Sequence, residues 1–246
     1  MVLHDRETNI DHYNRVVRDK TRLYDQRFDR HILSDRPIVR ELMANAYAQR
    51  FREEAGRMLD VGCGTGFYYP LLSRHAKRLV GIDVSDEMLQ IAKATIEACG
   101  LENCEVHHGS AADIEFPDGH FDAVHSWDVL HHVESPHRVL EEIMRVLKPG
   151  GLYVGFEPNV MNPSIAWYHM RRRSEWRLFL QNQFSLPGTL KQLAKVRIEY
   201  DNAIISFLNE KTWPLWKTVD VLSSFRCMRF VAFRYVIIAV KNQYTH

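Results

Sequence analysis

The stretch MLDVGCGTG, residues 58–66, decides the fold that this sequence predicts. MLDV is typical of a short buried strand. It runs directly into the glycine triplet Gly62, Gly64 and Gly66, after which an apolar helical pattern begins. Glycines let the backbone turn tightly and let a ligand lie against its N–H groups, and a helix N-terminus adds free donors and a partial positive charge. Strand, loop and helix in this order predict a nucleotide-type site in an α/β fold.

An acidic residue on the next predicted strand completes this motif. Asp83 ends the run LVGID, seventeen residues after Gly66, where a carboxylate can accept both hydroxyls of a ribose. Phe67 stands where a dinucleotide fingerprint would have its third glycine. Asp60 would repel a pyrophosphate but attract the α-ammonium of a methionine moiety. The residues therefore favour S-adenosylmethionine, and an NAD(P)-dependent oxidoreductase is kept as an alternative.

Short β-rich runs alternate with helical stretches from residue 57 to residue 157. Such alternation is typical of right-handed βαβ units and of a parallel sheet with helices on both faces, so the predicted fold class is α/β, doubly wound. Two helical segments precede this region, and the regular pattern stops after Glu157. We expect one domain over residues 1–246, made of an N-terminal helical lid (1–55), a cofactor-binding core (56–157), an acceptor cap (158–184) and the C-terminal part of the sheet (185–246).

The charge balance and the cysteine content exclude several classes. Thirty-two Lys and Arg against 31 Asp and Glu leave a formal net charge of +1, so any charge-based recognition must be local. The longest apolar run near the C-terminus, residues 230–240, is far shorter than the ~20 residues that span a bilayer, and the first residues lack the apolar segment of a secretory signal. The four cysteines have no zinc-ligand spacing. We expect a cytoplasmic protein with no nucleic-acid partner, no membrane span and no metal.

The motifs together resemble those of class I S-adenosylmethionine-dependent methyltransferases. LDVGCGTG resembles the first motif, VGIDVSDEML the second, and VLHHV and RVLKPGG the late motifs. The match covers about residues 57–157 and is closest to small-molecule enzymes related to the ubiquinone-biosynthesis methyltransferases. The resemblance implies a Rossmann-like, seven-stranded and mostly parallel sheet with a helical cap. It also implies S-adenosylmethionine as the cofactor and a small-molecule acceptor whose nucleophile is O, N or C.

The resemblance also implies which residues hold the cofactor. Asp60, Gly62 and Gly64 would line the methionine end, Asp83 the ribose, and Met88 the adenine. Many relatives carry an aspartate at the position of Ser110. The serine hydroxyl accepts a hydrogen bond from the adenine amino group more weakly than a carboxylate does. The adenine would then be held by the backbone N–H of Ala111 or by Asp113. The further expected cofactor residues are Cys63, Gly66, Val84, Ser110, Ala111 and Ser126.

Two histidines and a glutamate are the candidate catalytic residues. His131 and His132 follow the fourth predicted strand, and Glu157 ends the next one, so all three belong to the carboxyl edge of the sheet. A carboxylate that pairs with an imidazole fixes its tautomer and raises its basicity, as a general base requires. The alternatives are that the histidines only pack, or that the chain is a non-catalytic subunit that binds S-adenosylmethionine. The segment SWDV, residues 126–129, replaces the N-P-P-Y type segment of base-methylating relatives, which disfavours a nucleic-acid acceptor.

The predicted cap interleaves aromatic and cationic residues. As a lid, its aromatic side chains would exclude water and its arginines would clamp an anionic group of the acceptor. An amphipathic helix with a solvated charged face explains the same pattern. Tyr13 and Tyr24 of the first helix could also close the pocket, or pack in the core. The cap residues concerned are Trp167, Tyr168, Arg171, Arg172, Arg173, Trp176, Arg177, Phe179 and Phe184.

Overall fold

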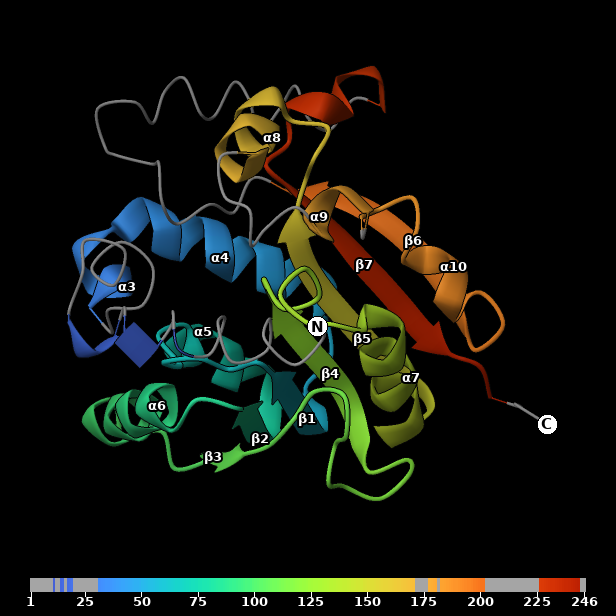
Figure 1. Ribbon diagram of the computed structural model, residues 1–246. Helices are drawn as coiled ribbons and strands as arrows, with labels where there is room; N and C mark the ends of the chain where they lie inside the picture. Colours follow the sequence, from blue (N-terminus) through green and yellow to red (C-terminus); the bar gives the residue numbers. More distant parts are fainter. Residues whose placement is uncertain are drawn as a thin grey trace.

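The computed structural model describes residues 11, 14, 15, 17–19, 31–170, 177–180, 182–201 and 226–243 (Figure 1). Several residues of the predicted lid and cap, namely Tyr13, Tyr24, Arg171, Arg172, Arg173 and Trp176, lie outside the described residues, as do the side chains of Tyr168 and Arg177.

A seven-stranded sheet forms the centre of the molecule, in the order β3-β2-β1-β4-β5-β7-β6. β7 is antiparallel to both of its neighbours, and every other pairing is parallel. This arrangement confirms the predicted doubly wound, mostly parallel sheet. The strands are β1 (Ala55–Val61), β2 (Ala76–Asp83), β3 (Cys104–His108), β4 (Phe121–Trp127), β5 (Leu147–Pro158), β6 (Ala194–Asp201) and β7 (Arg234–Lys241).

Helices cover both faces of this sheet, and each face has its own apolar core (Figure 1). One core packs α4, α5 and α6 against the sheet, and the other packs α7 and α10 against it. The described helical elements are α3 (Ile32–Asp35), α4 (Pro37–Arg50), α5 (Tyr69–Leu72), η1 (Ser73–His75), α6 (Asp86–Ala98), α7 (Pro136–Val146), α8 (Pro163–Met170), α9 (Arg177–Leu180), α10 (Pro187–Leu190) and η4 (Arg226–Val231).

Local sequence signals set the start of α6, and with it one wall of the site. The Ser85 side chain caps the helix by accepting a hydrogen bond from the Met88 N–H at 3.1 Å. Asp86 and Glu87 in the first turn add negative charge, which a helix N-terminus favours. The cap therefore holds α6 immediately after Asp83, at the carboxyl end of β2.

Among the described helices, none is long and apolar enough to cross a bilayer.

Candidate active site

The glycine loop after β1 has the backbone geometry that only glycine adopts easily. Gly62, Gly64 and Gly66 have φ angles of 68°, 54° and 62°. A Cβ on Gly62 would lie 2.6 Å from a Val129 methyl carbon, so that glycine is required by packing. A Cβ on Gly64 would meet no atom within 4 Å. The open space at Gly64 is therefore where a ligand can approach the backbone.

Asp83 is tied to this loop. Its Oδ2 accepts a hydrogen bond from the Gly64 N–H at 2.9 Å, and its Oδ1 accepts one from the Ser85 N–H at 2.9 Å. Burial raises the pKa of the Asp83 carboxyl, although these backbone donors partly offset the effect. Each carboxylate oxygen has a second lone pair, so both can still accept a ribose hydroxyl.

The open cradle and the carboxylate fit an adenosyl group with its ribose on Asp83. Val84, the next residue, is 40% exposed and offers an apolar surface beside the ribose position. Met88 is buried where α6 begins. The described N-terminal residues also reach this region, because the Ser85 hydroxyl donates to Asn14 Oδ1 at 2.6 Å and Arg18 pairs with Glu87 at 3.6 Å.

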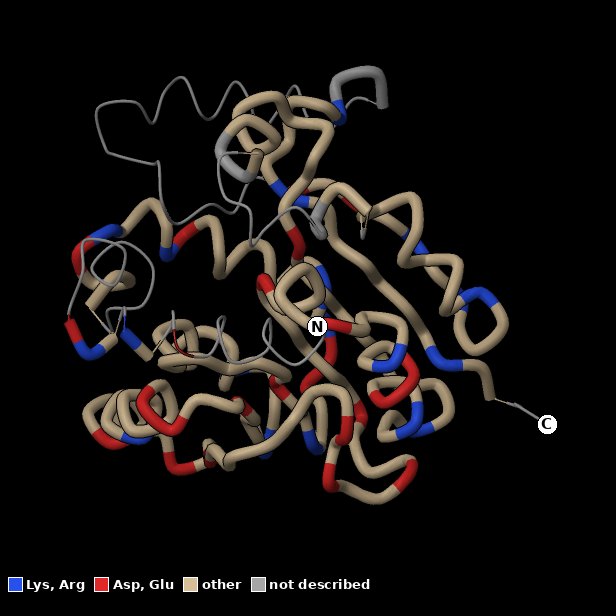
Figure 2. Tube along the Cα trace, viewed as in Figure 1, with Lys and Arg blue, Asp and Glu red and all other residues tan. Residues whose placement is uncertain are grey.

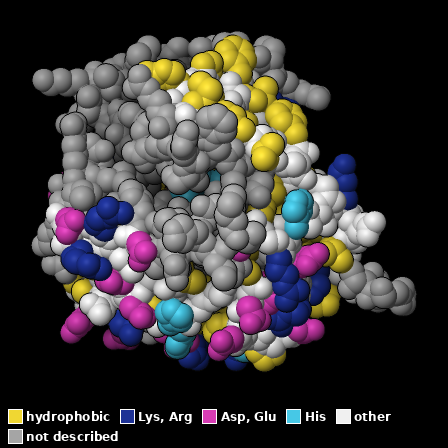
Figure 3. All heavy atoms as spheres, in the orientation of Figure 1, with side chains coloured by type: hydrophobic (Ala, Val, Ile, Leu, Met, Phe, Trp, Pro, Cys, Tyr) yellow, Lys and Arg dark blue, Asp and Glu magenta, His cyan; other side chains and the backbone are white. Residues whose placement is uncertain are grey.

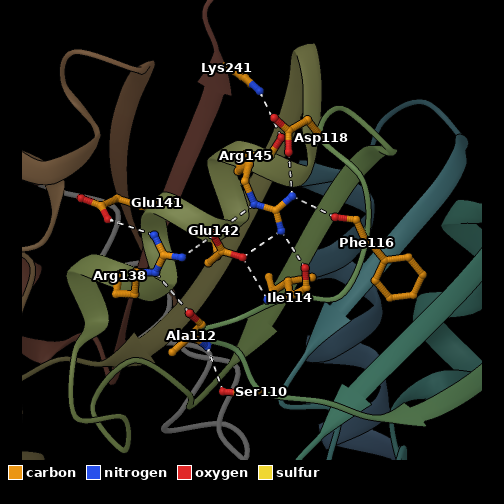
Figure 4. A network of polar contacts seen from close by, with 10 residues as sticks. All are labelled: Ser110, Ala112, Ile114, Phe116, Asp118, Arg138, Glu141, Glu142, Arg145 and Lys241. Carbon is orange, nitrogen blue, oxygen red and sulfur yellow. Dashed lines mark hydrogen bonds and ion pairs between the residues drawn. The ribbon is translucent and has the colours of Figure 1, made fainter.

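The loop after β3, which carries the predicted adenine contacts Ser110 and Ala111, is braced by charged residues of α7 (Figure 4). Glu142 accepts a hydrogen bond from the Ile114 N–H at 2.9 Å, and Arg145 donates to the Ile114 carbonyl at 2.6 Å. The guanidinium of Arg145, bonded to Glu142, lowers the pKa of that carboxyl. The other contacts within this brace are Ala112 N–H to Ser110 Oγ at 3.2 Å, Arg138 to the Ala112 carbonyl at 3.3 Å and Arg145 to the Phe116 carbonyl at 2.9 Å.

The Asp60 side chain has a different environment from the one that the sequence predicts. It is fully buried, with Oδ1 2.6 Å from His125 Nδ1 and with Oδ2 accepting a hydrogen bond from the Tyr68 hydroxyl at 3.0 Å. The carboxylate thus has two protein partners beneath the loop. Its contact with the methionine ammonium remains a prediction, while its observed contacts join β1 to β4 and to the start of α5.

Two other predicted cofactor residues point their side chains into the core. The Ser126 hydroxyl is buried and lies 2.9 Å from the Tyr153 hydroxyl. The Cys63 side chain is also buried, which raises the pKa of its thiol. The contact of Ser126 and of Cys63 with the cofactor remains a prediction.

The structure brings His131 and Glu157 together. His131 Nδ1 lies 2.6 Å from Glu157 Oε2, and Glu157 Oε1 accepts hydrogen bonds from the N–H groups of Val129 and Leu130 at 3.0 and 2.7 Å. The glutamate and His131 are both buried. The glutamate therefore fixes the loop after β4 and orients the imidazole. The ring of His132 lies next to it, with the centroids 3.8 Å apart.

A third group at this edge was not predicted from the sequence. Asp128, with φ of 56°, forms a two-bond ion pair with Arg234 at the start of β7, in which Nη2 and Oδ2 are 2.9 Å apart. The Arg234 guanidinium also lies over the Trp127 ring, 4.6 Å from its centroid. The pair links β4 to β7 across a large sequence separation, so no local pattern could have found it.

Comparison with known proteins agrees with this geometry. The profile of a family described as "Methyltransferase domain" matches residues 59–155. Demethylmenaquinone methyltransferase of Lactococcus lactis subsp. lactis is 34% identical over 181 residues, which cover 72% of this chain and 67% of that protein. Phosphatidylethanolamine N-methyltransferase of Cereibacter sphaeroides is 40% identical over 105 residues, 42% of this chain and 51% of that protein, so the chain spans about half the length of this relative.

A solved structure described as a SAM-dependent methyltransferase from Aquifex aeolicus shares the fold, with a TM-score of 0.56 and 23% identity, and the match covers 87% of this chain and 99% of that one. The chain belongs to the class I S-adenosylmethionine-dependent methyltransferases. S-adenosylmethionine is its cofactor, and this assignment replaces the NAD(P)-dependent alternative.

Proposed function

We propose that this methyltransferase acts on a small-molecule acceptor with an apolar body, at the carboxyl edge of β4 and β5. The observation that carries the proposal is the position of two groups at one edge. Gly64 and Asp83 follow β1 and end β2, while His131 and Glu157 follow β4 and end β5. β1 pairs with β4, and β4 pairs with β5 in parallel, so these carboxyl ends adjoin.

The chain's own residues would hold the cofactor from below. Gly64 would leave room for the methionine portion and Asp83 would accept the ribose hydroxyls. Val84, Met88, Ser110 and Ala111 would enclose the adenine. When bound, the cofactor supplies a methyl group on a positively charged sulfur. Because the leaving sulfur becomes neutral, the protein mainly has to position the nucleophile.

His131 would remove a proton from acceptors that carry one. Glu157 accepts hydrogen bonds from two backbone N–H groups and still contacts Nδ1, so it would keep the imidazole in one orientation and stabilise its protonated form. His132 is the neighbouring candidate for the same role. An acceptor whose nucleophile carries no proton would need only the positioning.

The apolar acceptor is supported by the family likeness. The relatives named above are described as acting on phosphatidylethanolamine and demethylmenaquinone, and each of these molecules has a long apolar part. We extend the proposal to the division of the chain, in which residues 1–55 form a lid and residues 158–184 form the cap over the acceptor. The contacts of Asn14 and Arg18 with α6 support the lid.

An acceptor panel tests the proposal. The full chain is incubated with methyl-labelled S-adenosylmethionine and an aminophospholipid, a demethylated quinone, a simple phenol or an amino acid, and label transfer is measured. We expect transfer to an apolar acceptor, and loss of that transfer in Asp83→Ala. Transfer to polar acceptors alone would overturn the proposal. Binding of S-adenosylhomocysteine with no transfer to any acceptor would support the non-catalytic alternative.

A further inference from the structure

Six large apolar side chains are exposed on three short helices beyond the carboxyl edge of the sheet and in the turns beside them. They gather over α8, α9 and η4 on the face shown in Figure 3. Their exposure runs from 39% for Met161 to 77% for Leu180. Contiguous exposed apolar groups on a folded domain mark surfaces that bind a partner or a membrane. We call this set the apolar platform, and its members are Met161, Trp167, Met170, Leu180, Phe184 and Phe230.

Buried amides hold the platform together from beneath. Asn159 donates to the Ala232 carbonyl at 2.9 Å and accepts a hydrogen bond from Gln183 at 3.0 Å. Asn162 donates to the Val231 carbonyl at 2.8 Å. These three amide side chains are all buried. The segments that carry the apolar side chains are therefore fixed to one another, and the apolar groups are presented outward by a built framework.

The platform adjoins the active-site edge. α8 begins shortly after β5, whose last residues include Glu157, and η4 leads directly into β7. Pro158 at the end of β5 is the register partner of Arg234 at the start of β7. A surface that covers the platform would thus lie beside the carboxyl ends of β4 and β5.

The charge of these segments indicates what covers the platform. The described residues of α8, α9 and η4 contain no acidic side chain (Figure 2), and Arg229 immediately precedes Phe230 of the platform. The sequences of these three helices contain Arg177, Arg226 and Arg229 and no Asp or Glu, so the helices carry a net positive charge. Apolar side chains beside arginines match a bilayer surface with anionic headgroups.

We propose that the apolar platform docks this methyltransferase on an anionic lipid bilayer, so that the active-site edge faces acceptors held in the membrane. The inference rests on the proposed apolar acceptor. Docking uses insertion of the exposed side chains at the headgroup level and attraction of the arginines of α9 and η4 to the anionic headgroups. It needs no helix that spans the membrane.

Vesicle co-sedimentation of the full chain tests this docking. Phosphatidylcholine vesicles with phosphatidylglycerol should bind the wild-type chain, and pure phosphatidylcholine vesicles or added salt should weaken the binding. The double variant Leu180→Ser/Phe184→Ser should lower the partition coefficient by about a hundredfold, since each buried side chain contributes about one factor of ten. Val240→Ser is the matched control, because Val240 is 39% exposed on β7 outside the platform, and it should bind as wild type does.

The outcomes separate the possible partners and the two proposals. S-adenosylhomocysteine binding by the double variant shows that it is folded. Equal vesicle binding by wild type and the double variant overturns the docking. Sedimentation equilibrium could also find that the wild-type chain is a dimer and the double variant a monomer. That result overturns the docking as well, because the platform is then an interface between two copies of the chain. Methylation of a detergent-dispersed apolar acceptor without vesicle binding would overturn the docking alone. Vesicle binding with transfer only to polar acceptors would overturn the proposed function.

Discussion

His125 Nδ1 lies 2.6 Å from Asp60 Oδ1, and the two residues are also register partners on neighbouring strands β4 and β1. Both side chains are fully buried. Removing one partner of a buried hydrogen-bonded pair leaves the other unsatisfied, which costs about 1–3 kcal/mol. The pair therefore ties the strand that enters the cofactor loop to the strand that leads to His131.

His125→Phe should lower the free energy of unfolding by about 1–3 kcal/mol, because Asp60 then keeps only Tyr68 as a side-chain partner among the described residues. Urea denaturation measures the change. The double variant His125→Phe/Asp60→Leu should recover much of the loss, since both polar partners are then replaced by apolar side chains. Wild-type stability in the single variant would show that the pair contributes nothing.

Gly64→Ala should fold but lose S-adenosylhomocysteine binding. The structure has room for the new Cβ, so the free energy of unfolding should fall only by the cost of an alanine at positive φ, about 1–2 kcal/mol. The methyl group would occupy space that the cofactor needs. Gly100→Ala is the matched control, because Gly100 has φ of 61°, equal room for a Cβ and a place at the end of α6. Calorimetry should find loss of binding in Gly64→Ala alone; equal affinity in both variants would move the site elsewhere.

Glu142→Gln should loosen the brace of the adenine-side loop and lower stability by about 2 kcal/mol at neutral pH. Arg145 lowers the folded-state pKa of Glu142, so this carboxylate stabilises the fold above its unfolded pKa and loses that effect as pH falls through the lowered folded value. Denaturation curves of wild type and variant should therefore converge on acidification below about pH 4. A stability difference that is unchanged across this range would contradict the assignment.

His131→Gln should reduce the turnover number by about 10²–10⁴-fold for an acceptor whose nucleophile must lose a proton. The affinity for S-adenosylhomocysteine should not change. His137→Gln is the control, because His137 is exposed on α7 and contacts Thr189. Steady-state kinetics with the acceptor found in the panel provides the measurement. Undiminished turnover in His131→Gln would mean that His132 is the base, or that the enzyme needs no base and only positions the acceptor.

The sequence predicted those parts of the site that depend on neighbours along the chain. The glycine loop and Asp83 are local signals, because turn geometry is set within a few residues. The pairing of a histidine with Glu157 could also be expected, because two strand ends share an edge.

The missed contacts depend on strand order and on side-chain direction. The contact of Asp60 with His125 on the adjacent strand β4 is one of them, because the pattern of β1 does not say which strand lies beside it. The same reason hides the ion pair of Asp128 with Arg234, which requires β7 to lie beside β5. Ser126 shows the effect of direction, because alternate residues of a strand face opposite cores.

The binding of S-adenosylhomocysteine to wild type and to Asp83→Ala, measured by titration calorimetry, tests the central assignment most directly. We expect Asp83→Ala to remain folded and to lose affinity at least tenfold, because each hydrogen bond to a carboxylate is worth about 1.5–3 kcal/mol. Burial raises the pKa of Asp83, so acidification should weaken binding to wild type at a higher pH than an exposed carboxyl would require, and should leave the variant unaffected. Equal affinity of the two proteins, with the same pH dependence, would contradict the assignment of the ribose site to the end of β2.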